Sequence, residues 1–394
     1  MSELLKKIRM RTWAEIDLDN IEYNLKAIKS SLSKEVKLCC VVKADGYGHS
    51  APEVSRLFEA LGADILAVSN IEEALQLRRA GITLPLLILG YTPAECAETL
   101  AKNNISQCVY SYEYGIALAN YANECSERVK IHIKLDTGMG RIGFLCRGDK
   151  NTELQDALEI CQNKNLIPEG IFTHFASADE AESGEEYTRA QYAEFCNAIS
   201  FFADNGVNFE VRHCANSAAT FRYPEYRMDM VRVGLALYGL TPFECSSLPT
   251  LRPAMSLRSV ISHVKTLKSG ESVSYGRKFT AVKDMRVATV PVGYADGFMR
   301  STANSDYTLK VGGKCAPILG RICMDQLLLD VSDIDCRVGD IVTIFDGEKE
   351  HSATALASAN GTIPYEVLCS VGKRVPRAFV RNSTIVEWSD EIYE

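Results

Sequence analysis

One lysine of the sequence follows directly on a run of apolar residues. Lys43 comes after the run 38–42, and Gly46 and Gly48 then allow a close backbone turn beside Tyr47. An ammonium group at the end of a buried strand loses hydration, which lowers its pKa unless an anion pairs with it. Lysines that form Schiff bases use this environment, although a lysine that reaches out to solvent is the commoner case. The segment therefore indicates a candidate nucleophile.

Two basic residues belong to a glycine-rich segment that follows another strand-like run. Lys134 lies within the run 129–135, and Arg141 follows the glycines at positions 138 and 140. A guanidinium binds a carboxylate through two parallel hydrogen bonds, so an arginine in such a loop suits an anionic group. The pattern taken alone is weak, because glycine-rich loops are common.

Three later segments carry further polar candidates. His174 ends a strand-like run, where a catalytic and a structural role are both open. Ser217 and Gly234 follow the last two runs, and they offer a hydroxyl and a backbone N–H to a phosphate. Helix capping by the serine and packing at the glycine are the alternatives. Arg232 lies between them in the sequence and is placed to face a cofactor ring.

The elements that must position these groups are short apolar runs separated by helical stretches. Helical periodicity marks 71–80 and 185–203. Strands that alternate with helices predict βαβ units and a (β/α)8 TIM barrel, and a doubly wound open sheet is the structural alternative. Eight runs are strand candidates, at 38–42, 65–69, 86–89, 107–111, 129–135, 170–175, 209–213 and 230–233.

The pattern changes near residue 252. Runs of alternating apolar and polar residues, joined by glycine and aspartate turns, then indicate antiparallel strands. One helical stretch, at 353–359, interrupts them. The sequence therefore predicts an α/β barrel domain over 1–245 and a mainly β C-terminal domain over 246–394.

Composition excludes several classes of protein. The formal net charge of -8 argues against bulk nucleic-acid binding, which needs a basic surface. No run approaches the apolar length of a transmembrane helix, and the first residues lack an apolar signal segment, so a cytoplasmic protein without a membrane partner is expected. The 14 cysteines form no CxxC pair, which predicts buried thiols and no metal site.

A series of motifs resembles the alanine racemase family, whose members use pyridoxal phosphate (PLP) and join an N-terminal (β/α)8 barrel to a C-terminal β domain. The resemblance runs from residue 11 to residue 377. The family's cofactor signature is VVKADGYGH at 41–49, followed here by Ser50 where glycine is commoner. Other matching motifs are IKLDTGMGRIGF, HCANSAAT, SVSYG, VPVGYADG, ILGRICMD and TIPYE.

The resemblance implies two bases on opposite faces of an amino-acid substrate. Lys43 would carry PLP and act as one base, and Tyr275 would act as the other. In this family that tyrosine comes from the partner subunit, so a head-to-tail homodimer with an active site at the subunit interface is implied. His174 would couple Tyr275 to Arg232, which would hydrogen-bond the pyridine nitrogen.

Further residues take binding roles by the same resemblance. Arg141 and the backbone of Met324 would take the substrate carboxylate, and Lys134 is a position that is often carbamylated, which would orient Arg141. Tyr294 and Tyr365 would narrow the access of substrate. The phosphate would be held by Tyr47, Ser217, Gly234, Leu235 and Tyr365.

The implied function is the interconversion of L-alanine and D-alanine, which would supply D-alanine for peptidoglycan. A serine or broad-specificity racemase is the nearest alternative, because pocket shape rejects one added hydroxyl poorly. A PLP-dependent amino-acid decarboxylase is a second alternative, and it would need no base at Tyr275. A PLP-binding protein without activity and a barrel enzyme without PLP are the more distant ones.

Overall fold

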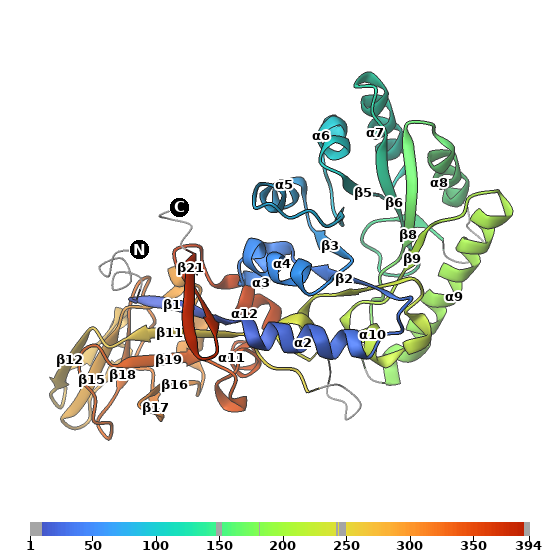
Figure 1. Ribbon diagram of the computed structural model, residues 1–394. Helices are drawn as coiled ribbons and strands as arrows, with labels where there is room; N and C mark the ends of the chain where they lie inside the picture. Colours follow the sequence, from blue (N-terminus) through green and yellow to red (C-terminus); the bar gives the residue numbers. More distant parts are fainter. Residues whose placement is uncertain (1–9, 147–151, 181, 242, 244–249, 390–394) are drawn as a thin grey trace.

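Eight parallel strands form a nearly closed barrel in the computed structural model, which describes residues 10–146, 152–180, 182–241, 243 and 250–389 (Figure 1). Their order is β10-β2-β3-β4-β5-β6-β8-β9, and the short strand β7 (Phe144–Leu145) pairs with β6. The strands are β2 (Lys37–Val41), β3 (Ile65–Val68), β4 (Leu86–Ile88), β5 (Ile105–Val109), β6 (Val129–Asp136), β8 (Leu166–Phe172), β9 (Val211–His213) and β10 (Met230–Val233).

Backbone hydrogen bonds link the last two strand segments and bring the ends of the sheet together. The amide of Arg232 donates to the carbonyl of Ala215 at 3.0 Å, and the amide of Asp229 donates to that of Arg212 at 3.2 Å. The predicted barrel is therefore confirmed, and the open-sheet alternative is wrong. All eight strand-like runs of the sequence are strands, because both faces of a barrel strand are buried and leave continuous apolar runs.

Helices separate the barrel strands and cover the outside of the barrel (Figure 1). Asn70 and Ser111 cap two of them, since their side chains accept hydrogen bonds from amides in the first helical turn. The helices are α2 (Leu18–Ser30), α3 (Lys43–Gly48), α4 (Ala51–Ala60), α5 (Ile71–Arg79), η1 (Ala94–Cys96), α6 (Ala97–Lys102), α7 (Tyr112–Glu124), α8 (Thr152–Gln162), α9 (Glu182–Asp204), α10 (Ser217–Arg222), η2 (Pro224–Tyr226) and η3 (Leu235–Tyr238).

The second body is mainly β, as predicted, and lies beside the barrel (Figure 1). Its largest sheet has the order β17-β16-β19-β11-β1-β20-β21, with β12-β15-β18 and β13-β14 as smaller sheets. Its strands are β1 (Thr12–Asp17), β11 (Met255–Val260), β12 (His263–Leu267), β13 (Ser272–Val273), β14 (Phe279–Thr280), β15 (Met285–Val290), β16 (Thr308–Val311), β17 (Lys314–Pro317), β18 (Leu327–Asp330), β19 (Ile341–Phe345), β20 (Arg377–Arg381) and β21 (Thr384–Ser389).

Short helices complete this body. The helical stretch predicted at 353–359 is α11. The full set is η4 (Tyr275–Arg277), η5 (Tyr294–Asp296), η6 (Arg300–Asn304), η7 (Lys349–His351), α11 (Ala353–Ala359) and α12 (Pro364–Ser370).

The first strand of the chain belongs to the sheet of the second body. β1 pairs antiparallel with β11 and parallel with β20, so the two ends of the sequence meet in one ladder. The division into 1–245 and 246–394 stays a prediction, since 244–249 lie outside the described residues and β1 crosses between the two bodies.

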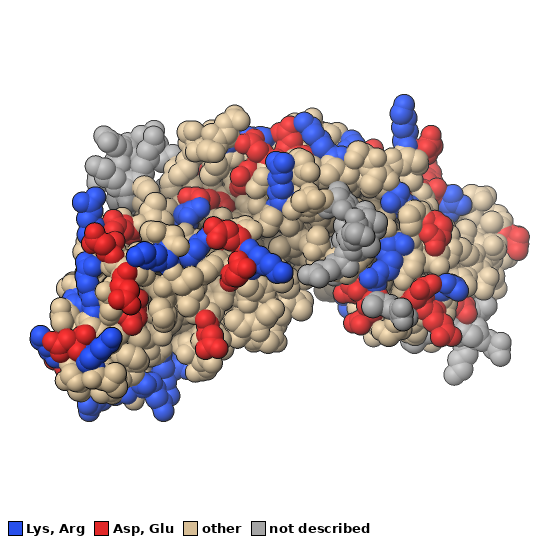
Figure 2. Space-filling view, turned by 90° about the horizontal axis from the view of Figure 1, so that it is seen from below, with Lys and Arg blue, Asp and Glu red and all other residues tan. Residues whose placement is uncertain are grey.

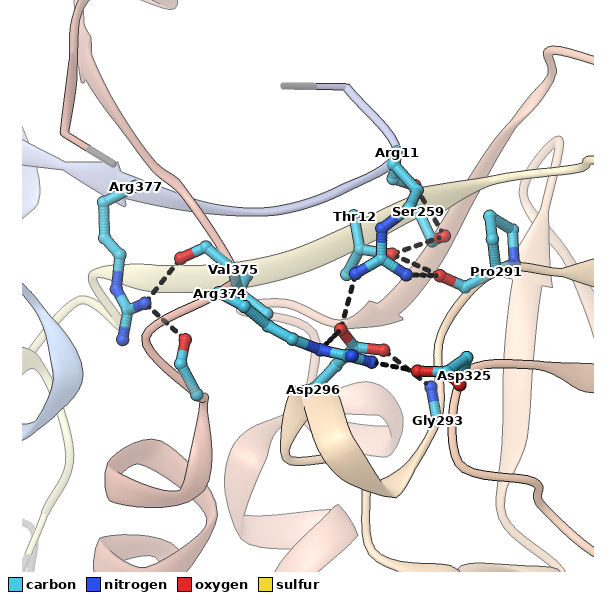
Figure 3. A network of polar contacts seen from close by, with 11 residues as sticks. Arg11, Thr12, Ser259, Pro291, Gly293, Asp296, Asp325, Arg374, Val375 and Arg377 are labelled. Atoms are coloured by element: carbon cyan, nitrogen blue, oxygen red, sulfur yellow. Dashed lines mark hydrogen bonds and ion pairs between the residues drawn. The ribbon is translucent and has the colours of Figure 1, made fainter. Parts of the chain in front are cut away.

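A buried carboxylate holds several segments of the second body together (Figure 3). Asp296 has no exposed side-chain surface, and its Oδ1 accepts hydrogen bonds from Arg11 Nη2 at 2.6 Å and from Arg374 Nε at 2.8 Å. Its Oδ2 accepts from the amide of Gly293 at 2.9 Å. Arg374 also donates to Asp325 at 2.6 Å. Segments far apart in the sequence are therefore tied to one acidic side chain.

This network positions two loops that carry predicted site residues. Tyr294 lies in η5, which Asp296 ends, and Met324 precedes Asp325 directly. Close by, Arg377 Nε donates to the carbonyl of Gly48 at 3.1 Å, which ties the turn after Lys43 to the second body. The polar contacts of the second body thus reach the mouth of the barrel.

We expect the change Asp296→Asn to lower the free energy of unfolding by about 2–3 kcal/mol, since hydrogen bonds to charged groups contribute roughly 1.5–3 kcal/mol each. Denaturant titration followed by circular dichroism measures the change. Asp284→Asn is the matched control, because Asp284 forms an exposed ion pair with Lys268. Equal stability of Asp296→Asn and the control variant would contradict the structural role of the network.

Candidate active site

A cavity of about 630 Å³ opens at the carboxyl ends of the barrel strands. Ten of the thirteen predicted site residues line it, although they come from segments spread over the whole chain. They are Lys43, Tyr47, Lys134, Arg141, His174, Ser217, Arg232, Gly234, Leu235 and Tyr365.

Lys43 opens a tight turn whose backbone is left-handed. Ala44, Asp45 and Tyr47 have φ values of 51°, 54° and 55°, a conformation that costs about 1–2 kcal/mol for each non-glycine residue. Hydrogen bonds offset this cost: the amide of Ala44 donates to Glu73 Oε1 at 2.8 Å, and Asp45 Oδ1 accepts from the amide of Ala51 at 2.7 Å. Such strain concentrates at functional sites, where the surrounding structure holds it.

The amine of Lys43 lies in an environment that favours its neutral form. Burial lowers its pKa, and the nearby guanidinium of Arg141 lowers it further. A neutral amine is the nucleophile that adds to a carbonyl carbon. Geometry and charge thus agree with the role that the sequence indicates for this residue.

Ser217, Gly234 and Tyr47 form a small polar cradle on one side of the cavity. The amide of Gly234 donates to Ser217 Oγ at 3.0 Å. A Cβ at position 234 would lie only 2.4 Å from the hydroxyl oxygen of Tyr47, so only glycine fits there. Burial raises the pKa of Tyr47, which keeps its hydroxyl protonated as a donor. The ring of Tyr365 packs 5.9 Å from that of Tyr47.

Arg232 is the most constrained cation of the site. Only 4% of its surface is exposed, and its Nη2 donates to the carbonyls of Thr173 and Cys214 at 2.9 and 3.1 Å. Its Nη1 lies 2.8 Å from His213 Nδ1, and its Nη2 lies 3.3 Å from His174 Nδ1. Burial lowers its pKa to about 10, so it remains a cation near neutral pH.

His174 faces this cation as a neutral ring. Burial lowers its pKa well below the ordinary value, and the charges of Arg232 and Arg141 lower it further. Because Arg232 has only donors, His174 Nδ1 must accept. Its other nitrogen then carries the hydrogen and is the free donor of the ring.

Lys134 and Arg141 supply the remaining positive charge. Lys134 is 2% exposed, and burial lowers its pKa to about 8, so part of the population is neutral near pH 7. Arg141 is exposed at the rim, beyond a loop that Asp136 holds by accepting from the amides of Gly138 and Gly140. Among the described lining residues Asp179 is the one carboxylate, so the cavity suits an anionic ligand.

Three predicted site residues lie outside the cavity. Tyr275, Tyr294 and Met324 all belong to the second body, with exposed fractions of 67%, 42% and 52%. Tyr275 follows the short strand β13, which packs in a cluster with Leu267 and Val287 of β12 and β15. Those strands lie at the end of the second body that is remote from the barrel (Figure 1). One chain therefore does not bring Tyr275 to Lys43.

Sequence reasoning missed several residues that shape the site. Phe172, Tyr91 and Asp179 line the cavity, and no motif marked them. His213 was quoted within a motif without a role, and His132 behind it was not considered. A signal was present: polar residues alternate with apolar ones along 129–135, which places Lys130, His132 and Lys134 on one face of β6.

Other features of the described residues bear on binding. They contain no group of three or more His, Cys, Asp or Glu side chains able to hold a metal ion. Within the same residues, no helix has the length and apolar character needed to cross a membrane. Basic and acidic side chains are interspersed on the face shown in Figure 2.

Comparison with known protein families gives matches over both bodies. The model described as the N-terminal domain of alanine racemase matches residues 16–242, and that of the C-terminal domain matches residues 254–379. An alanine racemase of Clostridium tetani is 42% identical over 379 residues, which is 95% of this chain and 96% of the relative. One from Methanococcus maripaludis is 40% identical, over 93% of this chain and 98% of the relative.

Solved structures agree with the sequence matches. The alanine racemase of Clostridium difficile 630 in complex with cycloserine superposes with a TM-score of 0.88 and 40% identity, covering 96% of this chain and 98% of the other. The alanine racemase of Bacillus anthracis with bound L-Ala-P gives a TM-score of 0.90 and 36% identity, covering 98% of both chains.

We expect Gly234→Ala to weaken the binding of PLP about tenfold or more, since overpacking a filled site costs roughly 1–3 kcal/mol. The new methyl group would displace the hydroxyl of Tyr47. Titration of the cofactor-free protein with PLP, followed by absorbance, measures the affinity. Gly347→Ala is the control, because its methyl group would meet Pro253 only at 4.0 Å. Equal affinities of the two variants would argue against the cradle.

Proposed function

Since the chain belongs to the alanine racemase family and is an isomerase, we propose that it interconverts L-alanine and D-alanine with PLP held on Lys43. The observation that carries the proposal is the cavity itself. It gathers a lysine of lowered pKa, a buried arginine and a polar cradle at the carboxyl ends of the barrel strands. Relatives named alanine racemase that match nearly the full length of the chain support the same activity.

The residues of the cavity fit PLP by their chemistry. The hydroxyls of Tyr47 and Ser217 and the backbone N–H of Leu235 suit a phosphate, and the glycine at 234 leaves the room that a side chain would fill. Arg232 would face the ring nitrogen, and a cation there that does not readily give up its proton would leave the ring unprotonated. When bound, PLP withdraws electrons from the Cα of the amino acid and makes its proton removable.

The proton is moved by groups of the protein on opposite faces of the substrate. Lys43 Nζ takes or supplies the proton on one face, and the hydroxyl oxygen of Tyr275 does so on the other. One residue acts as acid while the other acts as base, so the configuration at Cα is inverted. His174 couples Tyr275 to Arg232 through its free ring nitrogen.

The position of Tyr275 supports a head-to-tail homodimer. Tyr275, Tyr294 and Met324 are exposed and lie away from the cavity of their own chain. In the proposed dimer, Tyr275 of the partner subunit completes the site that Lys43 begins. Exposed aromatic and Met side chains are also typical of interface residues.

Arg141 and Lys134 bind the substrate carboxylate in this proposal. Arg141 holds the carboxylate at the rim, together with the backbone N–H of Met324 from the second subunit. Lys134 is proposed to be carbamylated: its neutral amine adds to the carbon of CO₂ and releases one proton. The resulting anion then orients the guanidinium of Arg141.

Alanine is the proposed substrate, with serine as the nearest competitor. Tyr365 packs against Tyr47 beside the cradle and narrows the space for a side chain larger than methyl. One added hydroxyl is poorly rejected by shape, so relative rates on alanine, serine and lysine define the specificity. A cytoplasmic supply of D-alanine for peptidoglycan is the role that this activity fits.

Incubation with L-alanine in D₂O tests the function. We expect D-alanine to form with deuterium at Cα and without release of CO₂, as chiral chromatography and mass spectrometry would detect. Lys43→Ala should abolish the reaction and the visible absorption of lysine-bound PLP, whereas Lys102→Ala, on the exposed surface of α6, should keep both. Release of CO₂ would instead indicate a decarboxylase, and a reactive Lys43→Ala would exclude Lys43 as the cofactor lysine.

Tyr275→Phe tests the division between the two bases. We expect exchange of the Cα proton of L-alanine to slow by about 10²–10⁴-fold, which is the usual contribution of a general acid or base. Exchange from D-alanine, which depends on Lys43, should be much less affected. Tyr121→Phe on the surface of α7 is the control. An equal loss with both enantiomers would be evidence against two separate bases.

A further inference from the structure

A line of polar side chains runs from Arg232 into the interior of the barrel. Arg232 Nη1 lies 2.8 Å from His213 Nδ1, and His213 Nε2 lies 2.9 Å from His132 Nδ1. His132 Nε2 lies 3.3 Å from Glu169 Oε2. The two rings are at most 1% exposed, whereas 21% of the Glu169 side chain reaches solvent. The line thus connects the cavity to a carboxylate outside it.

The backbone is shaped to make this line possible. On β6, the neighbours Ile131 and His132 pair with Pro168 and Gly170 of β8, so Glu169 is the extra residue of a β-bulge. A bulge re-aims the side chain of its extra residue. A Cβ at position 170 would lie 2.4 Å from His132 Nδ1, so glycine makes the room that the ring occupies.

Hydrogen-bond chemistry sets one direction along the line. Arg232 has only donors, so His213 Nδ1 accepts and the hydrogen of this ring is on Nε2. That N–H donates to His132 Nδ1, which places the hydrogen of the second ring on its own Nε2. This second N–H then donates to Glu169, an acceptor-only carboxylate. Both rings therefore have the same tautomer and are neutral.

The carboxylate at the end of the line is ionised. The hydrogen bond from His132 is the main cause that lowers the pKa of Glu169 to about 2, and the hydroxyl of Ser106 donates to the same oxygen at 2.6 Å. Lys130 contacts the other oxygen at 3.4 Å. A negative charge is thus held at the end of the line opposite the positive charge of Arg232.

Such a line is costly in a barrel interior, which apolar side chains usually fill. Aromatic packing supports it here, because the ring of Phe172 stacks on His213 with centroids 4.8 Å apart. The same ring lies 5.3 Å from the guanidinium carbon of Arg232. Neither His132 nor Glu169 lines the cavity, so neither touches a ligand there.

We propose that Glu169, acting through His132 and His213, is a positioning residue that holds Arg232 in one orientation as a cation beneath the cofactor ring. The proposal rests on the proposed function, in which Arg232 faces that ring. Without the carboxylate, neither tautomer of His132 is preferred. The opposite tautomer would turn an N–H of His213 toward the N–H groups of Arg232, and the guanidinium would have to move.

Glu169→Gln tests the proposal, because it removes the charge and keeps the size of the side chain. We expect kcat to fall about tenfold with little change in KM, as for the loss of a hydrogen bond to a charged group. Nitrogen-15 NMR of histidine-labelled protein supplies a readout apart from activity. Wild-type His132 and His213 should both carry hydrogen on Nε2 only, and Glu169→Gln should shift the signals of both rings.

Lys130→Gln is the matched control, because Lys130 contacts the same carboxylate from the other oxygen and takes no part in the line. It should keep kcat and both histidine signals. Glu169→Gln with wild-type kcat, or a wild-type His213 with hydrogen on Nδ1, would overturn the proposal, and so would equal losses in the two variants. If the wild-type protein fails to racemise alanine, the proposed function falls, while the tautomers still report on the line.

Discussion

The burial of one guanidinium governs the organisation of the barrel interior. Arg232 is almost fully enclosed, so its five N–H groups need partners within the protein. Carbonyls of Thr173 and Cys214 and the rings of His174 and His213 supply them. Each of these partners stands at or just beyond the end of a strand, and the placement of the strands around the barrel follows the needs of this cation.

The charge of Arg232 also tunes its neighbours. It keeps His174 and His213 neutral and contributes, after burial, to the lowered pKa of Lys134. Lys43 and Arg141 add further positive charge to the same cavity. Cations held this close together repel one another, and an anionic phosphate and carboxylate would relieve that repulsion. The cavity is therefore built for anions before it is specific for an amino acid.

Local pattern predicted most of the barrel but little of what lies behind the site. Buried parallel strands leave continuous apolar runs, so Lys43 and the ends of eight strands were visible in the sequence. The pairing of β1 with β20 was not, because its partners lie at opposite ends of the chain. Glu169 was hidden by its bulge, since an extra residue shifts the alternation that would have placed it beside His132.

The central claim is that two chains are needed for one active site, and complementation of two inactive variants tests it most directly. Lys43→Ala and Tyr275→Phe proteins would be mixed, dissociated and allowed to reassociate. If Tyr275 acts in the site of the partner, each mixed dimer has one intact site, and specific activity should return to about one quarter of wild type with random assortment. No recovery, with mixed dimers verified by mass spectrometry, would contradict the account.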